Sequence, residues 1–280
     1  MTSEAPGPEP AQDHGRAGRD LRAAITVGVS LAAVVLLSLF WVKDLFIVVV
    51  AGALVIAAVE LSRALTNAAI TVPLPPLLVG GVTMLVVAFY DDMETAAAVM
   101  ALTVIAVMAW RLRSGADGFV RDATAGVFAL AYLFLMGTFV MRMLADEDGP
   151  WRVVAFIGVT IASDIGGYAA GVLFGKHPMA PTISPKKSWE GFAGSLIAST
   201  VAGVLVVVLA LDGAWWVGLL LGVAGVCFAT LGDLCESLIK RDIGVKDMGD
   251  LLPGHGGIMD RLDSLIVVAP VAYLVMYLLI

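Results

Sequence analysis

A stretch near the C-terminus combines basic, acidic and glycine residues in a way that suits phosphate chemistry. It reads SLIKRDIGVKDMGDLLPGHGGIMDRLDSL from Ser237 to Leu265. A site for a bare anion would be basic only, whereas a mixed cluster suits a phosphate ligand bridged by a divalent cation. A solvated loop is the plain alternative, but ionisable groups beside apolar spans more often have a function. The charged residues from 240 to 263 are four basic (Lys240, Arg241, Lys246, Arg261) and five acidic (Asp242, Asp247, Asp250, Asp260, Asp263).

The most specific feature of this stretch is the i, i+3 spacing of Asp260 and Asp263. If the last helix begins at about Ile258, both carboxylates project from one face. Magnesium accepts one or two carboxylates and completes its shell with water and phosphate oxygens. The glycines around His255 could present backbone N–H groups to an anion at the helix start, with Gly256 and Gly257 closest to it. We therefore predict a metal and phosphate site here.

Other carboxylates lie deeper in apolar segments and need an explanation. Asp233, Glu236, Ser237 and Lys240 share one helix face; a Glu236–Lys240 pair explains Glu236 but not Asp233. Asp164 lies near the middle of an apolar span and is predicted to face a polar cavity. Gly167, Gly171 and Gly175 share its helix face in a small-xxx-small pattern that favours tight helix packing. In the first half, Glu60 and Arg63 are expected only to cap and anchor their own span.

A second polar stretch, ISPKKSWEG from Ile183 to Gly191, carries adjacent lysines, Lys186 and Lys187. Lysines beside a membrane often only mark the cytoplasmic side or contact anionic lipid. A kink at Pro185 and Trp189 at interfacial depth suggest instead a shaped element.

These residues are carried by a chain that is 60% hydrophobic and only 15% charged, against about 25% charged in an ordinary soluble domain. The apolar residues form long blocks without the period-two alternation of barrel strands. We predict an all-α polytopic integral membrane protein with about nine transmembrane helices. The expected spans are Ala23–Val42, Leu45–Val59, Val72–Tyr90, Thr95–Trp110, Thr124–Leu144, Trp151–Phe174, Phe192–Leu211, Ala214–Ile239 and Leu265–Ile280.

The basic residues predict the orientation of these spans. With the N-terminus in the cytoplasm, 14 of the 17 lysines and arginines fall on the cytoplasmic side. The C-terminus is then on the opposite side. Residues 1–22 are predicted to be a disordered cytoplasmic tail, 23–150 the N-terminal transmembrane helices and 151–280 the catalytic region, with cytoplasmic loops 175–191 and 240–264.

The stretch from Ser237 to Asp263 resembles the C-terminal motif of the phosphatidate cytidylyltransferases, the CDP-diacylglycerol synthases. That pattern is Ser-x-x-Lys-Arg, four residues, Lys-Asp, then Pro-x-His-Gly-Gly-x-x-Asp-Arg-x-Asp, and every position is filled here. The resemblance extends over about 163–264 and includes Ser163-Asp164, Gly232-Asp233 and the Ser184-Pro185-Lys186-Lys187 element. Ser188 stands where the family usually has Thr, and Val172 where many members have Arg, which puts details of phosphate or headgroup contact in doubt.

The resemblance implies a nucleotidyl transfer, in which a phosphatidate oxygen attacks the α-phosphorus of CTP and pyrophosphate leaves. It implies Mg²⁺ as cofactor, a role in phospholipid biosynthesis, a multi-pass cell-membrane location with the active site on the cytoplasmic side, and a homodimer; no nucleic-acid partner is expected. The residue roles it implies are catalytic for Asp233, Lys240, Arg241, Lys246, Asp260, Arg261 and Asp263, substrate-binding for Ser184, Lys186, Lys187, Ser237, His255, Gly256 and Gly257, and metal-binding for Asp164, Asp233, Asp260 and Asp263.

Three other functions compete with this prediction. A CTP-dependent polyprenol or phytol kinase would transfer the γ-phosphate to a lipid alcohol, but the dense motif match argues against it. A CDP-alcohol phosphotransferase would need an Asp-Gly-x-x-Ala-Arg block, which the sequence lacks. A transporter would use Asp164 on an ion path, yet no second copy of the polar motifs indicates paired repeats.

Overall fold

The computed structural model describes residues 21–249, 251 and 256–280. Of the predicted tail, 1–22, only residues 21 and 22 are described. His255 also lies outside the described residues. The described residues are helical apart from turns, connections and one short hairpin. The elements are α1 (Leu21–Trp41), α2 (Lys43–Thr66), α3 (Leu74–Tyr90), α4 (Met93–Arg111), a 3₁₀ turn (Leu112–Ser114), α5 (Phe119–Ala129), a π-helical turn (Leu130–Leu135), α6 (Met136–Ala145), α7 (Gly149–Phe174), β1 (Pro178–Ala180), β2 (Ser184–Ser188), α8 (Trp189–Ala210), α9 (Trp215–Asp242) and α10 (Met259–Leu279).

Within the described residues, seven helices are long and apolar enough to cross a membrane. Two further apolar helices, at 32–41 and Leu74–Tyr90, are shorter. The polytopic all-α architecture expected from the sequence is therefore present, while the count of nine spans stays a prediction. The seven long helices are Lys43–Thr66, Met93–Ser114, Phe119–Ala145, Gly149–Phe174, Trp189–Ala210, Trp215–Asp242 and Met259–Leu279.

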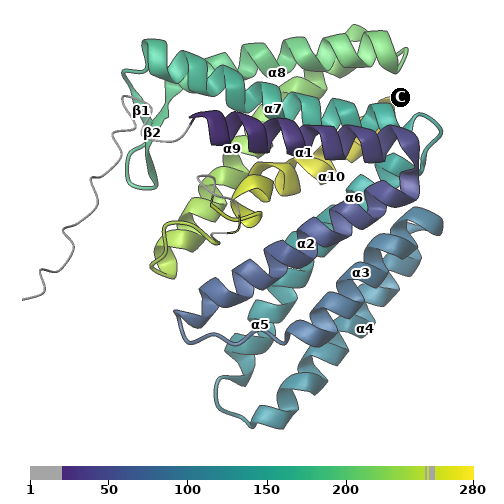
Figure 1. The fold of residues 1–280 in the computed structure, drawn as a ribbon, viewed down its shortest axis with the longest axis vertical. Coiled ribbons are helices and arrows are strands. Elements are labelled where there is room, and N and C mark those ends of the chain that lie inside the picture. Colours follow the sequence, from purple (N-terminus) through teal and green to yellow (C-terminus); the bar gives the residue numbers. More distant parts are fainter. Residues whose placement is uncertain (1–20, 250, 252–255) are drawn as a thin grey trace, which may run out of the picture.

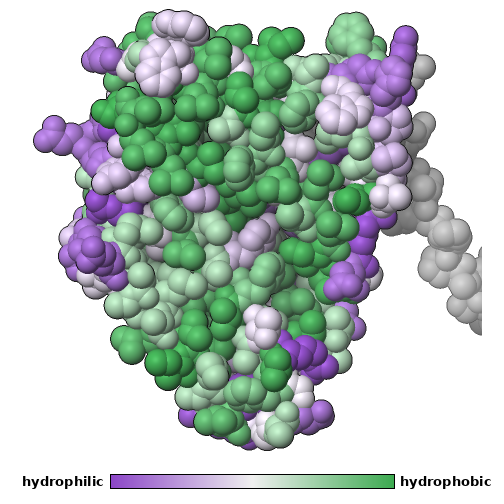
Figure 2. Space-filling model, turned by 180° about the vertical axis from the view of Figure 1, so that it is seen from behind, coloured by the Kyte–Doolittle hydropathy of each residue, from purple (hydrophilic) through white to green (hydrophobic). Residues whose placement is uncertain are grey.

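The surface of the molecule fits an apolar surrounding. Large apolar side chains such as Leu173 and Leu209 are more than 70% exposed. Figure 2 shows a wide hydrophobic area on one face, with hydrophilic residues gathered toward its edges. Exposed apolar surface on this scale is expected where lipid rather than water surrounds the helices.

Helices α7 and α8 run side by side along much of their length (Figure 1). Small residues allow this approach: a Cβ on Gly166 would collide with the carbonyl oxygen of Gly194, and one on Gly167 with the hydroxyl of Ser195. The small-residue pattern predicted from the sequence is thus a real packing seam. The packing continues beyond this seam, because α9 packs against α8 and α10 packs against α9.

The hairpin β1–β2 and the segment that joins α9 to α10 lie at the same end of the molecule (Figure 1). The start of α1 is also at this end, whereas the C-terminus of α10 is at the other. The two polar stretches of the sequence therefore meet in space, because α7, α8, α9 and α10 alternate in direction.

The N-terminal helices have a polar anchor of their own. The guanidinium of Arg111 donates to Asp122 Oδ2 (Nε–Oδ2 2.9 Å), and the Thr71 N–H donates to Asp122 Oδ1 (3.1 Å). Arg111 also donates to the carbonyl oxygens of Gly115 and Asp117. This cluster ties the end of α4 to the start of α5 and to the 67–73 connection.

Candidate active site

A cavity of about 320 Å³ opens between the hairpin and helices α7, α8, α9 and α10. Ser163, Asp164 and Tyr168 come from α7, Ser184, Lys186 and Lys187 from β2, Asp233 from α9 and Ser264 from α10. The remaining lining is mostly small: Gly167, Gly171, Ser188, Gly191, Ser195, Ala229 and Thr230, with Met179 and Phe192. Every helix of the C-terminal half therefore contributes to one polar chamber.

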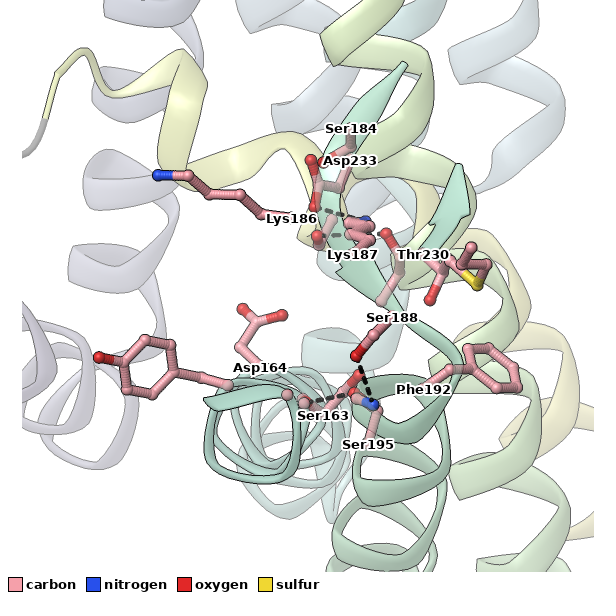
Figure 3. Close-up of a pocket in the computed structure, with 17 residues that line it drawn as sticks. Ser163, Asp164, Ser184, Lys186, Lys187, Ser188, Phe192, Ser195, Thr230 and Asp233 are labelled. Carbon is pink, nitrogen blue, oxygen red and sulfur yellow. Dashed lines mark hydrogen bonds and ion pairs between the residues drawn. The ribbon is translucent and has the colours of Figure 1, made fainter. Parts of the chain in front are cut away.

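Lysine and carboxylate side chains face each other inside this cavity (Figure 3). Lys187 Nζ forms an ion pair with Asp233 Oδ2 (2.5 Å). The Asp164 carboxylate points into the cavity from below that pair, and the Lys186 side chain extends away from the pair. The prediction that Asp164 faces a polar cavity is confirmed, because Asp164 lines this cavity together with Lys186, Lys187 and Asp233.

Local contacts hold the hairpin in place over the cavity. Ser188 is the N-cap of α8 and its hydroxyl accepts from the Gly191 N–H (3.1 Å). Glu190 accepts from the backbone N–H groups of Lys176 and His177 (3.2 Å each) and pairs with His177 Nδ1 (2.6 Å). The predicted loop 175–191 is thus a β-hairpin whose two ends are joined by the Glu190 side chain. Its last residues, from Trp189 on, belong to α8.

The two aspartates at the start of α10 have different surroundings. Asp260 accepts from Lys240 Nζ (2.9 Å) and from the Gly257 N–H (2.8 Å), and the Met248 N–H also donates to it (3.1 Å). Asp263 is not among the described residues that line the cavity, but it interacts electrostatically with Asp233 and Asp164, which are. Residues three apart on a helix differ in direction by about 60°, and here Asp260 contacts the segment before α10 while Asp263 interacts with the two cavity aspartates.

Helix α9 holds Asp260 in place through Lys240. Glu236 is fully buried and pairs with Lys240, which also contacts Asp260. The i, i+4 pair expected from the sequence is therefore present, and it extends into a Glu236–Lys240–Asp260 chain. Ser237 Oγ makes a long contact to Asp233 Oδ1 (3.4 Å).

The other predicted residues lie around the joining segment. Arg241, Lys246 and Arg261 are exposed at the same end of the molecule, outside the cavity lining. The Gly257 N–H, expected to face a phosphate, donates to Asp260, because that carboxylate lies directly in front of it. Gly256 adopts a positive φ of 76°, and a Cβ there would come within 2.9 Å of Asp260 Oδ2. Substrate binding by Gly256 and Gly257 stays a prediction.

A metal ion can be tested against these groups. Within the part of the chain that the structure describes, no three histidine, cysteine, aspartate or glutamate side chains gather as a ready metal site. Magnesium, however, needs only one or two protein carboxylates when phosphate and water supply the rest. Asp164, Asp233 and Asp263 are close enough to repel one another, and the positive charges of Lys187, Lys240 and Arg261 offset part of that repulsion. Their chemistry fits a divalent cation.

The sequence is similar to known proteins over nearly its whole length. Residues 22–279 match the model of the cytidylyltransferase family. The phosphatidate cytidylyltransferase of Mycobacterium bovis is 43% identical, over 97% of this chain and 93% of the relative. That of Mycobacterium leprae is 43% identical over 94% of this chain and 90% of the relative, and that of Haemophilus influenzae 36% identical over 60% and 52%.

The chain belongs to the cytidylyltransferase family.

In this cytidylyltransferase the structure also identifies site residues that the sequence did not single out. Ser195 lines the cavity and donates to the Ser163 carbonyl oxygen (2.6 Å), while Thr230 and Phe192 line the wall opposite Asp164. A weak signal was available, since Ser195 and Ser199 are polar residues four apart in an apolar helix. Both are buried and donate to α7, which fits helix packing equally well.

Proposed function

We propose that this chain is a phosphatidate cytidylyltransferase that converts CTP and phosphatidate into CDP-diacylglycerol and pyrophosphate. The observation that supports this best is the cavity itself, in which Lys187 of the hairpin pairs with Asp233 of α9 and lies near Asp164 of α7. The sequence similarity to relatives named for this reaction extends over nearly the whole chain, so it includes the N-terminal helices.

The proposed chemistry is an attack by a phosphatidate phosphate oxygen on the α-phosphorus of CTP. The bond between the α-phosphorus and the bridging oxygen breaks, and pyrophosphate leaves with the electron pair. Such transfers depend on positioning and charge neutralisation more than on covalent help from the protein. We assign Lys186 and Lys187 to substrate phosphate, since lysine binds phosphate as a point charge. Arg241, Lys246 and Arg261 are proposed to meet the remaining phosphate charge at the rim.

We propose that Asp233 and Asp263 hold Mg²⁺, with Asp164 in contact with it or with its water. The ion supplies neutralisation of phosphate charge when bound. Asp260 was predicted as a further ligand. Its bonds to Lys240 and to two backbone N–H groups favour a different role, in which it fixes Lys240 and the segment before α10.

We infer further that the N-terminus and the active site are cytoplasmic, where CTP is available. The distribution of basic residues supports this, and so does the position of the start of α1 at the same end as the hairpin. Tags at the two termini, probed in intact and permeabilised cells, should be found on opposite sides. Both tags on one side would refute the nine-span arrangement. A homodimer in the lipid bilayer remains an expectation from the family resemblance.

Purified protein incubated with phosphatidate, Mg²⁺ and CTP labelled at the α-phosphate tests the reaction. Label should enter a CDP-lipid, stop when the metal is chelated and return when Mg²⁺ is added back. Label at the γ-phosphate should leave as pyrophosphate. If γ-label instead entered a lipid, the protein would be a kinase, and the proposal would be refuted.

A further inference from the structure

Glu60 is a buried carboxylate in the half of the chain that carries none of the motifs. It lies on α2 and is only 5% exposed. The sequence predicted no more for it than a cap on its own span. That prediction is wrong, because the side chain of Glu60 reaches across to α10.

The contact lies at the first residue of the helix that carries Asp260 and Asp263. Glu60 Oε2 accepts from the Met259 N–H (2.9 Å). Helix α10 starts at Met259, and its N-cap residue, Ile258, offers no side-chain cap. The first N–H groups of a helix lack partners within the helix, and the helix dipole favours a negative charge there. Glu60 therefore caps α10 from another helix.

The segment before α10 is shaped to admit this carboxylate. A Cβ on Gly249 or Gly257 would overlap the Glu60 carboxylate. The second oxygen, Oε1, is buried and has no hydrogen-bond partner among the described residues. Burying a carboxylate with so few partners is costly, so stability of α2 alone does not explain it.

We propose that Glu60 is a positioning residue for the cytidylyl transfer. It fixes the first turn of α10, and with it the Asp260–Lys240 contact and the position of Asp263 near Asp233. This inference rests on the proposed function. It also assigns the N-terminal helices a part in catalysis, because α2 is the element that supplies the cap.

Three substitutions separate positioning from mere folding. In E60A the Met259 N–H loses its acceptor, and we expect kcat to fall about 10- to 100-fold, the scale on which small misplacements of catalytic groups act. The KM for CTP should change little, because Glu60 does not line the cavity that holds Lys187 and Asp233. E60Q keeps an acceptor oxygen and should restore most of kcat. G249A should lower kcat by displacing Glu60, and E60A/G249A should be no worse than E60A alone.

Amide hydrogen exchange supplies a readout that does not depend on the reaction. In the full-length protein, peptides covering 256–264 should exchange faster in E60A and at the native rate in E60Q. D122N, which removes a buried carboxylate of the N-terminal half, is the matched control and should leave kcat per folded molecule unchanged.

The outcomes are distinguishable. A native enzyme that makes no CDP-lipid would refute the proposed function. A native enzyme that does, together with native kcat and native exchange in E60A, would refute the role of Glu60 alone. If E60A does not fold, G249A takes its place in the test. A lower kcat in G249A would then support the role of Glu60, and a native kcat would refute it.

Discussion

Two ion pairs, Arg111–Asp122 in the N-terminal half and Lys187–Asp233 in the C-terminal half, have similar charges but different roles. In the N-terminal half, the Arg111 and Asp122 side chains are 8% and 3% exposed, and each carboxylate oxygen has a partner. In the C-terminal half, Lys187 and Asp233 are 23% and 37% exposed and open onto the cavity.

The difference lies in what remains available to a ligand. Arg111 and Asp122 use their hydrogen-bonding capacity on the protein, so they connect elements and leave nothing for a substrate. Lys187 and Asp233 pair with one another and line an open cavity. The neighbouring carboxylates Asp164 and Asp263 add negative charge, which Arg261 and Lys240 offset in part. Burial of charge thus indicates function only where the charge is incompletely paired.

The largest expected effect on rate comes from Asp233, which lines the cavity, and from Asp263, which interacts with it. D263N and D233N keep the side-chain shape and lose the charge, so each should fold and insert normally. Each should lose activity by about 10²-fold or more, the scale of removing one transition-state stabiliser. Steady-state kinetics at several Mg²⁺ concentrations are the measurement. Full activity of either variant at low Mg²⁺ would place the metal elsewhere.

Asp260 should be affected less than Asp263, although the sequence treats them alike. In D260N the contacts to Lys240 and to the Gly257 N–H are weakened rather than a metal ligand lost. We expect an activity loss of about tenfold, the scale of one charge-assisted hydrogen bond. If D260N lost as much activity as D263N and needed as much more Mg²⁺, Asp260 would be a metal ligand, contrary to this prediction.

A smaller effect is expected at the hairpin lysines, and it should appear in substrate binding. K187A and K186A should raise the KM for CTP or phosphatidate with a lesser change in kcat, because a charge on phosphate acts already in the ground state. Lys187 pairs with Asp233, whereas Lys186 points away from this pair, so K187A should have the larger effect. Normal saturation in both variants would leave these lysines as markers of topology.

The smallest effect on rate, and the largest on stability, is expected in the N-terminal half. D122N should lower the free energy of unfolding by roughly 3–5 kcal/mol, the cost of breaking a buried pair. Activity per folded molecule should stay native. Thermal unfolding in detergent, together with kcat corrected for folded protein, measures both. A loss of kcat without a loss of stability would contradict the contrast between the two halves.

Much of the architecture could be predicted from hydrophobic blocks, because backbone polar groups in lipid must be satisfied within each helix. The predicted start of the last helix at about Ile258 agrees with α10, which begins at Met259. The hairpin was missed, since five residues of β2 among lysines and proline carry no period-two pattern. The nine-span count and the orientation stay predictions, as composition alone does not show where lipid ends.

What the sequence by itself determined is the set of chemical groups: carboxylates and lysines whose types and spacing match the cytidylyltransferase motif. Which of these groups share a chamber was decided by the tertiary structure. Asp260 and Asp263 are equivalent by spacing, yet one binds Lys240 and the other lies beside Asp233. Glu60 lies 199 positions from Met259 and carries no motif, yet caps its helix. Such pairings depend on how helices cross, and local sequence does not encode a contact made across the whole chain.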